Sequence, residues 1–217
     1  MPRIIVWLYL AATAVNLVAN VLPSEELNRF TKPLLMPLLL FYIYRRSIGN
    51  TTAKVLLLSV AILFSWFGDV VLMYKSNEAY FIAGIGLFLV AQITYVFVLR
   101  KATYQRPKIG LRSLLPFAAY AAVLFYVLLP AGDFTIPIIV YGVVILLMAL
   151  SAYSRRERTS HRSFQLAFIG SILCVLSDSI LAINAFKTPI PYAGVFIMAT
   201  YCAAQLLLVE GLLDHAD

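Results

Sequence analysis

The sequence is poor in the residues that build most soluble catalytic centres. Its 217 residues include two histidines, two cysteines and only 12% charged residues. His161 and His215 both lie outside the long apolar runs, which disfavours a zinc hydrolase and a Ser-His-Asp triad. Cys174 and Cys202 lie within apolar runs, so neither a disulfide framework nor a Cys-x-x-Cys site is indicated. No GxSxG or P-loop pattern occurs, and we expect no cofactor and no metal.

Most of the chain consists of apolar residues. The chain is 62% hydrophobic with a mean hydropathy of +0.90, whereas soluble domains are about 45 to 50% apolar. The sequence therefore predicts a single transmembrane domain over residues 1–217. The net charge of +7 comes from basic residues in short loops between apolar runs, a pattern that marks the cytoplasmic side of a membrane and argues against a nucleic-acid partner.

Apolar runs long enough to cross a bilayer, roughly 17 to 25 residues, organise the whole chain. They predict an all-α polytopic membrane bundle of eight transmembrane helices, near residues 4–21, 33–44, 55–74, 80–99, 113–129, 136–153, 164–186 and 191–213. The first run is too long for the apolar part of a signal peptide and is kept as a helix. The second is short, and Pro33 suits the first turn of a helix.

The distribution of positive charge predicts the topology. Most of the 17 Lys and Arg residues fall at the chain start and in the loops after the second, fourth and sixth helices. By the positive-inside rule, both termini are then cytoplasmic. The third and seventh helices run in the same direction, each carries an aspartate, and each is followed by a helix that carries a glutamine (Gln92 or Gln205). This suggests a weak parallel 4+4 repeat.

Two aspartates interrupt these apolar helices. Asp69 lies in FSWFGDVVLMY and Asp178 in CVLSDSILA. An ionisable side chain at membrane depth is costly and usually faces a protein interior or a wet cavity, where it has a function. Asp69 has the more apolar neighbours, while Ser177 and Ser179 flank Asp178. These neighbours suggest that Asp69 is a proton donor and Asp178 an anion.

Other polar residues share single helix faces at spacings of three or four. Such amides and phenols line binding pockets or simply hydrogen-bond neighbouring helices. Lys32 is the candidate cation on the outer side; it would neutralise an aspartate, bind a phosphate, or extend to the interface as lysines at helix ends usually do. The residues on shared faces are Asn16 with Asn20, Gln92 with Tyr95, and Tyr201 with Gln205.

The ordered set of motifs resembles the YhhN-like lysoplasmalogenase family over nearly the whole chain, from Asn16 to about Gly211. The motifs are Lys32-Pro33-Leu34 before Met36, Gly68-Asp69 before Leu72, Gln92 with Tyr95, Ser177-Asp178 before Leu181, and Tyr201 with Gln205. This resemblance implies an ether hydrolase that cleaves the vinyl ether bond of lysoplasmalogens. The implied products are a fatty aldehyde and glycerophosphoethanolamine or glycerophosphocholine.

On this resemblance, Asp69 and Asp178 are expected to be catalytic through acid-base chemistry. Lys32 is expected to bind the head-group phosphate, and the pocket is expected to be lined by Asn16, Asn20, Gln92, Tyr95, Tyr201 and Gln205. The expected partners are a lysophospholipid substrate and the surrounding membrane lipids, with the oligomeric state left open. The host membrane would be the inner membrane of a bacterium or the endoplasmic reticulum of a eukaryote.

Two other classes of function fit the same residues. A proton-coupled transporter also uses membrane carboxylates, and it would move its substrate across a sealed vesicle without forming a product. In a non-catalytic lipid-binding protein the aspartates would be structural, so their amide variants would fail to fold.

Overall fold

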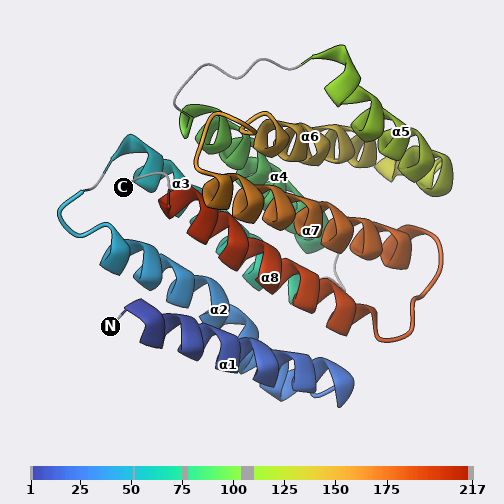
Figure 1. The fold of residues 1–217 in the computed structure, drawn as a ribbon. Helices are drawn as coiled ribbons and strands as arrows, with labels where there is room; N and C mark the ends of the chain where they lie inside the picture. Colours follow the sequence, from blue (N-terminus) through green and yellow to red (C-terminus); the bar gives the residue numbers. More distant parts are fainter. Residues whose placement is uncertain (1, 51, 75–77, 104–109, 215–217) are drawn as a thin grey trace.

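The described residues of the computed structural model, 2–50, 52–74, 78–103 and 110–214, form eight α-helices and one short 3-10 helix (Figure 1). The all-helical architecture predicted from the apolar runs is confirmed. The elements are α1 (Pro2–Val21), α2 (Glu25–Arg46), α3 (Ala53–Leu72), α4 (Glu78–Lys101), α5 (Leu111–Leu128), η1 (Gly132–Phe134), α6 (Thr135–Tyr153), α7 (His161–Phe186) and α8 (Ala193–Leu213).

The second helix differs most from its prediction. It begins at Glu25, not at Pro33, because Ser24 caps it by accepting from the Leu27 N–H and two glutamates occupy its first turn. Pro33 is therefore inside the helix, and its assignment to the first turn was wrong. His161 begins α7, although it was predicted to lie outside the helices. His215 lies outside the described residues.

Seven helices within the described ranges are long and apolar enough to cross a membrane, so the chain is an integral, multi-pass membrane protein. The exception is α2, which contains Arg29, Lys32 and two prolines. That α2 also crosses the bilayer stays a prediction, as does the parallel repeat.

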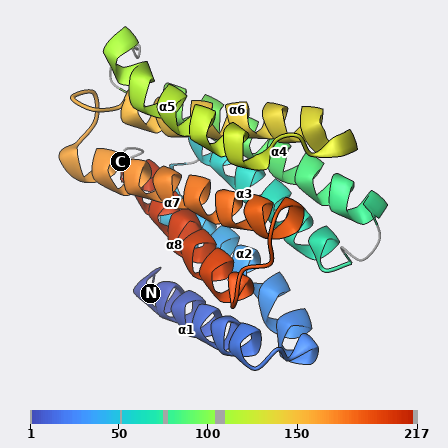
Figure 2. The same cartoon turned by 90° about the vertical axis from the view of Figure 1, so that its right-hand side faces the viewer.

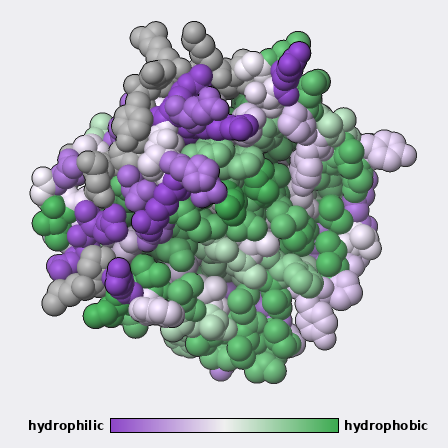
Figure 3. Space-filling view, in the orientation of Figure 1, coloured by the Kyte–Doolittle hydropathy of each residue, from purple (hydrophilic) through white to green (hydrophobic). Residues whose placement is uncertain are grey.

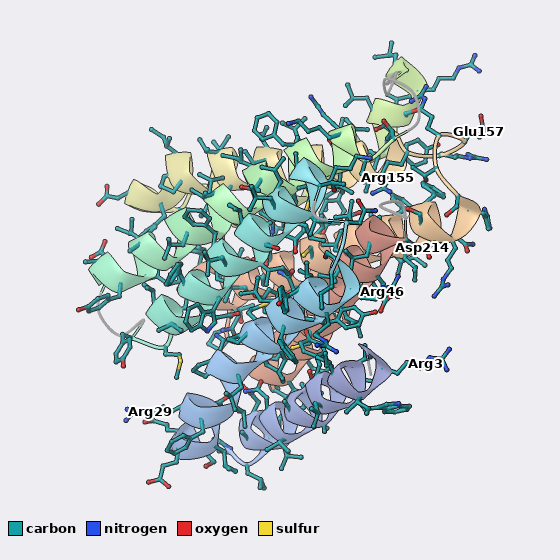
Figure 4. All side chains as sticks on the ribbon, turned by 90° about the vertical axis from the view of Figure 1, so that its left-hand side faces the viewer. Arg3, Arg29, Arg46, Arg155, Glu157 and Asp214 are labelled. Atoms are coloured by element: carbon teal, nitrogen blue, oxygen red, sulfur yellow. The ribbon has the colours of Figure 1, made fainter. Side chains whose placement is uncertain are left out.

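The helices form a bundle with α1 at one edge and α5 at the opposite edge (Figures 1 and 2). Both chain ends lie at the same end of the bundle, and hydrophilic residues gather there, while much of the remaining visible face is hydrophobic (Figure 3). Arg3, Arg46 and Arg155 lie at this end and Arg29 at the other (Figure 4).

Small residues bring α7 and α8 into backbone contact along their length. A Cβ atom added at Gly170 would lie 2.9 Å from the backbone nitrogen of Leu208, and one at Gly211 would lie 2.6 Å from that of Ala167. Close approach through small residues is the usual basis of helix packing in membranes. It fixes α7, which carries Asp178, against α8, which carries Tyr201.

Candidate active site

A mainly apolar cavity of about 120 Å³ lies among the helices, toward the end of the bundle opposite the chain termini. Residues from α2 to α8 and η1 contribute to its wall. Its polar lining residues are Lys32, Asp69, Tyr141, Ser177, Asp178, Ser179 and Tyr201. The two aspartates predicted as catalytic therefore line one cavity.

Asp69 on α3 is almost completely buried and has two polar partners. The ammonium nitrogen of Lys32 lies 3.4 Å from its Oδ1 atom, and the Tyr201 hydroxyl donates to Oδ2 at 2.7 Å. Only 20% of the Lys32 side chain is exposed, so the lysine is not extended to the interface. Among the three alternatives for Lys32, the structure shows neutralisation of an aspartate. An ammonium group this close stabilises the carboxylate form of Asp69.

Two prolines on α2 help to hold Lys32 in this place. Pro37 has no N–H, so the carbonyl of Pro33, four residues earlier, lacks its helical partner. The indole Nε1 of Trp66 on α3 donates to this carbonyl at 2.8 Å. Trp66 lies one turn before Asp69, and Pro33 directly follows Lys32. The hydrogen bond therefore ties α2 to α3 beside the ion pair.

Gly68 shapes the wall next to Asp69. A Cβ atom at this position would lie 2.7 Å from the ring of Phe88 on α4, so only glycine lets that ring pack against α3. Phe88 in turn meets the ring of Tyr201 edge to face, with 5.9 Å between centroids. The glycine thus supports the tyrosine that binds Asp69.

Asp178 on α7 has partners of a different kind. Its Oδ2 atom accepts from the Tyr141 hydroxyl at 2.5 Å and from the Gln92 amide at 3.5 Å. No described lysine or arginine forms an ion pair with it. Asp178 is therefore surrounded by neutral donors, whereas Asp69 faces a cation.

The serines beside Asp178 do not donate to its carboxylate. The Ser177 hydroxyl donates to the Ile197 carbonyl on α8, and the Ser179 hydroxyl bonds the Val175 carbonyl and Tyr120. On a helix, adjacent residues point in different directions. The interpretation that these serines hold Asp178 as the anion is therefore not supported by the contacts.

The remaining predicted pocket residues are placed around the cavity in different ways. Tyr201 lines it, and Gln92 reaches Asp178. Gln205 accepts from the Tyr95 hydroxyl at 2.5 Å and donates to Ser65 at 3.3 Å, in a buried layer between α4, α8 and α3 that is outside the cavity lining. These two side chains connect helices.

Asn16 and Asn20 do not line the cavity either. The Asn16 amide donates to Asn28 and to Thr31, at 2.9 Å in each case, and the Asn20 amide donates to the Asn16 carbonyl at 2.8 Å. These amides form a polar layer between α1 and α2, which is the helix-connecting role that amides often have in membrane bundles.

Sequence reasoning missed Tyr141 on α6, the nearest hydrogen-bond donor to Asp178. Its signal was a single phenol within a very apolar segment, TIPIIVYGVVILL.

Sequence reasoning also missed three phenylalanines from separate elements, Phe81, Phe134 and Phe186. Their ring centroids lie 5.2 to 6.0 Å apart, and all three line the cavity. We call these three the phenylalanine cluster. In the described part of the chain, no three His, Cys, Asp or Glu side chains are grouped to hold a metal ion.

The fold and the cavity define a polytopic helical membrane protein with two carboxylates in an apolar cavity. A family model described as YhhN matches residues 27–212. The chain belongs to the YhhN family, which confirms the resemblance stated from the motifs.

Curated relatives carry the name of an activity. The chain is 32% identical over 163 residues to "Lysoplasmalogenase TMEM86A" of Bos taurus and 30% identical over 163 residues to that of Homo sapiens, in each case across 73% of this chain and 65% of the relative. It is 30% identical to "Lysoplasmalogenase TMEM86B" of Homo sapiens, across 70% of this chain and 61% of the relative. The matches thus span a little less than two thirds of these relatives. No solved structure matches the chain.

Proposed function

We propose that the protein hydrolyses the vinyl ether bond of lysoplasmalogens, releasing a fatty aldehyde and a glycerophosphoethanolamine or glycerophosphocholine. The observation that carries this proposal is that two carboxylates line one apolar cavity with different partners, a cation for Asp69 and neutral donors for Asp178. The names of the relatives support the same reaction class.

The partners of the two carboxyls support the roles in the order opposite to the one suggested by sequence neighbours. Asp69 is the anion, because Lys32 and Tyr201 both stabilise its charged form. Asp178 is the acid, because a carboxyl group in an apolar cavity without a cation is less costly when protonated. Environments that separate the protonation of two carboxyls are how one site supplies both an acid and a base.

The chemistry needs one acid and one anion. The carboxyl proton of Asp178 is transferred to the alkenyl carbon remote from the ether oxygen, and the double bond becomes an oxocarbenium ion. The carboxylate of Asp69 stabilises this cation and accepts a proton from the attacking water. The resulting hemiacetal breaks its bond to the glycerol oxygen, which takes the proton held by Asp69, while the hemiacetal O–H proton goes to Asp178. This gives the aldehyde and the free alcohol and returns both carboxyls to their starting states.

Product analysis of amide variants tests this proposal. Wild type, Asp69→Asn and Asp178→Asn are purified in detergent and incubated with alkenyl and acyl lysophospholipids, and the products are measured by mass spectrometry. Wild type should release aldehyde from the alkenyl substrate, and each variant should be slower by a factor of about a hundred or more. Asp133→Asn, at an exposed carboxylate in η1, is the matched control and should keep full activity.

Different outcomes would point to the other classes of function. Release of fatty acid from the acyl substrate alone would indicate ester hydrolysis. Flux of an intact lysolipid across sealed vesicles without product would indicate a transporter. Folded amide variants with normal turnover would remove the acid-base mechanism.

We also propose that both chain ends face the cytoplasm and that the cavity lies toward the outer leaflet. The support is the positive-inside rule together with the basic side chains at the end that holds the termini (Figure 4). Labelling of single cysteines introduced at Arg3 and Lys187, with a reagent that does not cross membranes, tests this orientation. Only the second should react in intact cells.

A further inference from the structure

Part of the cavity is an apolar trough that runs along the helices away from the aspartates. On α7 five lining residues lead away from the site, namely Asp178, Leu181, Ala182, Ala185 and Phe186, the last residue of the helix. Ser177 and Ser179 flank the first of them in the lining. Eight residues of helix correspond to a length of about 12 Å. All five positions share one helix face, so they form a continuous stripe.

On the neighbouring α6 the lining residues likewise change from polar beside Asp178 to apolar further away. From Tyr141, the donor to Asp178, its lining passes Ile138 and Pro137 and ends at Phe134 in η1, directly before the helix. On α4, the lining residues Phe88, Ile85 and Phe81 are spaced by three and four and lead toward the same end of the bundle. Beyond Ser179, three elements therefore lead from the carboxylates to the phenylalanine cluster without another polar lining residue.

Helix α5 forms a wall of this trough. Leu124 and Leu128 line the cavity, while Val123 and Tyr126 on the same helix are 64% and 87% exposed. The inner face of α5 packs with Ile138 of α6 and with Ala182 and Ile183 of α7. Beyond Ser179, a ligand in the trough would therefore meet hydrocarbon and aromatic side chains.

The chemistry of the wall selects the kind of group that the trough holds. A charged head group there would lose its hydration without gaining a partner, which is costly. A hydrocarbon chain would gain a similar amount of binding free energy for each methylene group that it buries. Because the trough has one apolar arm leading from the carboxylates, it suits a lipid with one chain.

We propose that this trough is the subsite for the hydrocarbon chain of a single-chain ether lipid, with the ether group at the aspartates and the chain end at the phenylalanine cluster. Phe134 and Ala182 then set the preferred chain length. The inference rests on the proposed function for the position of the ether group. The binding of the chain does not depend on catalysis.

Two variants should shift the chain preference in opposite directions. Phe134→Ala removes one ring of the cluster and should favour longer chains, whereas Ala182→Phe fills the middle of the trough and should favour shorter ones. The expected change is about fourfold in relative affinity for each methylene gained or lost, the effect of burying one CH2 group. If one variant does not fold, the other still tests the subsite.

Binding is measured with saturated alkyl lysophospholipids, which lack the vinyl ether, in an Asp178→Asn background across a series of chain lengths. Phe117→Ala, on the α5 face that meets Tyr153, and Ala119→Phe, at an exposed position of α5, are the matched controls. Both should leave the profile unchanged. The aldehyde-release profile of each variant in the wild-type background is then compared with its binding profile.

The outcomes separate the two proposals. Opposite shifts for Phe134→Ala and Ala182→Phe, with unchanged controls, support the chain subsite even if the wild-type protein releases no aldehyde, in which case only the proposed reaction fails. Identical chain profiles in folded variants and wild type overturn the chain subsite, even where aldehyde is released. Loss of binding at every length in a folded Phe134→Ala variant also overturns the assignment of chain length to this ring.

Discussion

The ion pair between Lys32 and Asp69 offers the most direct test of the site. Changing Lys32 to methionine keeps much of the side-chain volume but leaves Asp69, which is 2% exposed, with only Tyr201 as a partner. Removing one member of a buried pair costs about 3 to 5 kcal/mol. Because 20% of the Lys32 side chain is exposed, we expect the lower end of this range, about 3 kcal/mol.

A double-mutant cycle isolates the pair from the packing. In the variant with both Lys32→Met and Asp69→Asn, no uncompensated charge remains, so its unfolding free energy should exceed that of Lys32→Met by about 1 to 2 kcal/mol. Thermal unfolding in detergent measures these differences. A loss of 3 kcal/mol corresponds to a decrease in Tm of roughly 6 to 12 °C in a chain of this size.

An exposed pair provides the control for this cycle. Arg29 and Glu25 on α2 are 3.7 Å apart, with side chains that are 70% and 86% exposed, and exposed pairs contribute at most about 1 kcal/mol. The same cycle there should give a coupling near zero. If the two changes at Lys32 and Asp69 also add within about 0.5 kcal/mol, the lysine does not hold Asp69 as an anion, and the assignment of roles is wrong.

Two further variants test the surroundings of each aspartate. Tyr141→Phe removes the hydroxyl that donates to Asp178, and we expect kcat to fall roughly 10- to 100-fold with little change in Tm, since one oriented hydrogen bond is lost. Gly68→Ala places a Cβ atom 2.7 Å from the Phe88 ring, and we expect a loss of about 1 to 3 kcal/mol from overpacking and a decrease in Tm of roughly 2 to 12 °C.

The chain provides matched controls for both variants. Tyr126→Phe changes a hydroxyl on an 87% exposed side chain and should leave kcat unchanged. Gly86→Ala lies on the same helix as Phe88, but its added Cβ atom meets nothing within 4 Å, so Tm should stay the same or rise slightly. An equal loss of kcat in Tyr126→Phe, or an equal loss of Tm in Gly86→Ala, would contradict the reasoning from contacts.

Most of the fold could be predicted because a helix surrounded by hydrocarbon consists largely of apolar residues, and such long apolar runs are visible in the sequence. Segments such as 136–153 are apolar throughout, and the helix forms there as Thr135–Tyr153. The family was also predictable from the ordered motifs around Asp69 and Asp178, and the family model confirms it. In both cases the signal lies in the residues themselves, without reference to their contacts.

Features that depend on contacts between helices could not be predicted in this way. The start of α2 depends on the Ser24 cap. Inside the helix, the carbonyl of Pro33 lacks a helical donor because Pro37 has no N–H, and Trp66 of another helix donates to it instead. Likewise, Ser177 beside Asp178 in sequence donates to a different helix. Neighbours along a helix are poor guides to neighbours in space, so the hydrogen-bond and ion-pair partners of the two aspartates could not be predicted from the sequence.

The position of α5 has a consequence for how reactants would arrive. Its Leu124 and Leu128 line the cavity, while Tyr126 on the same helix points outward, so at this edge one helix stands between the cavity and the acyl chains of the bilayer. A lipid that entered at this edge would displace α5 and would not need to be extracted into the aqueous phase. For a hydrolysis in such a cavity, delivery of water is then the more demanding step, because most of the lining residues are apolar.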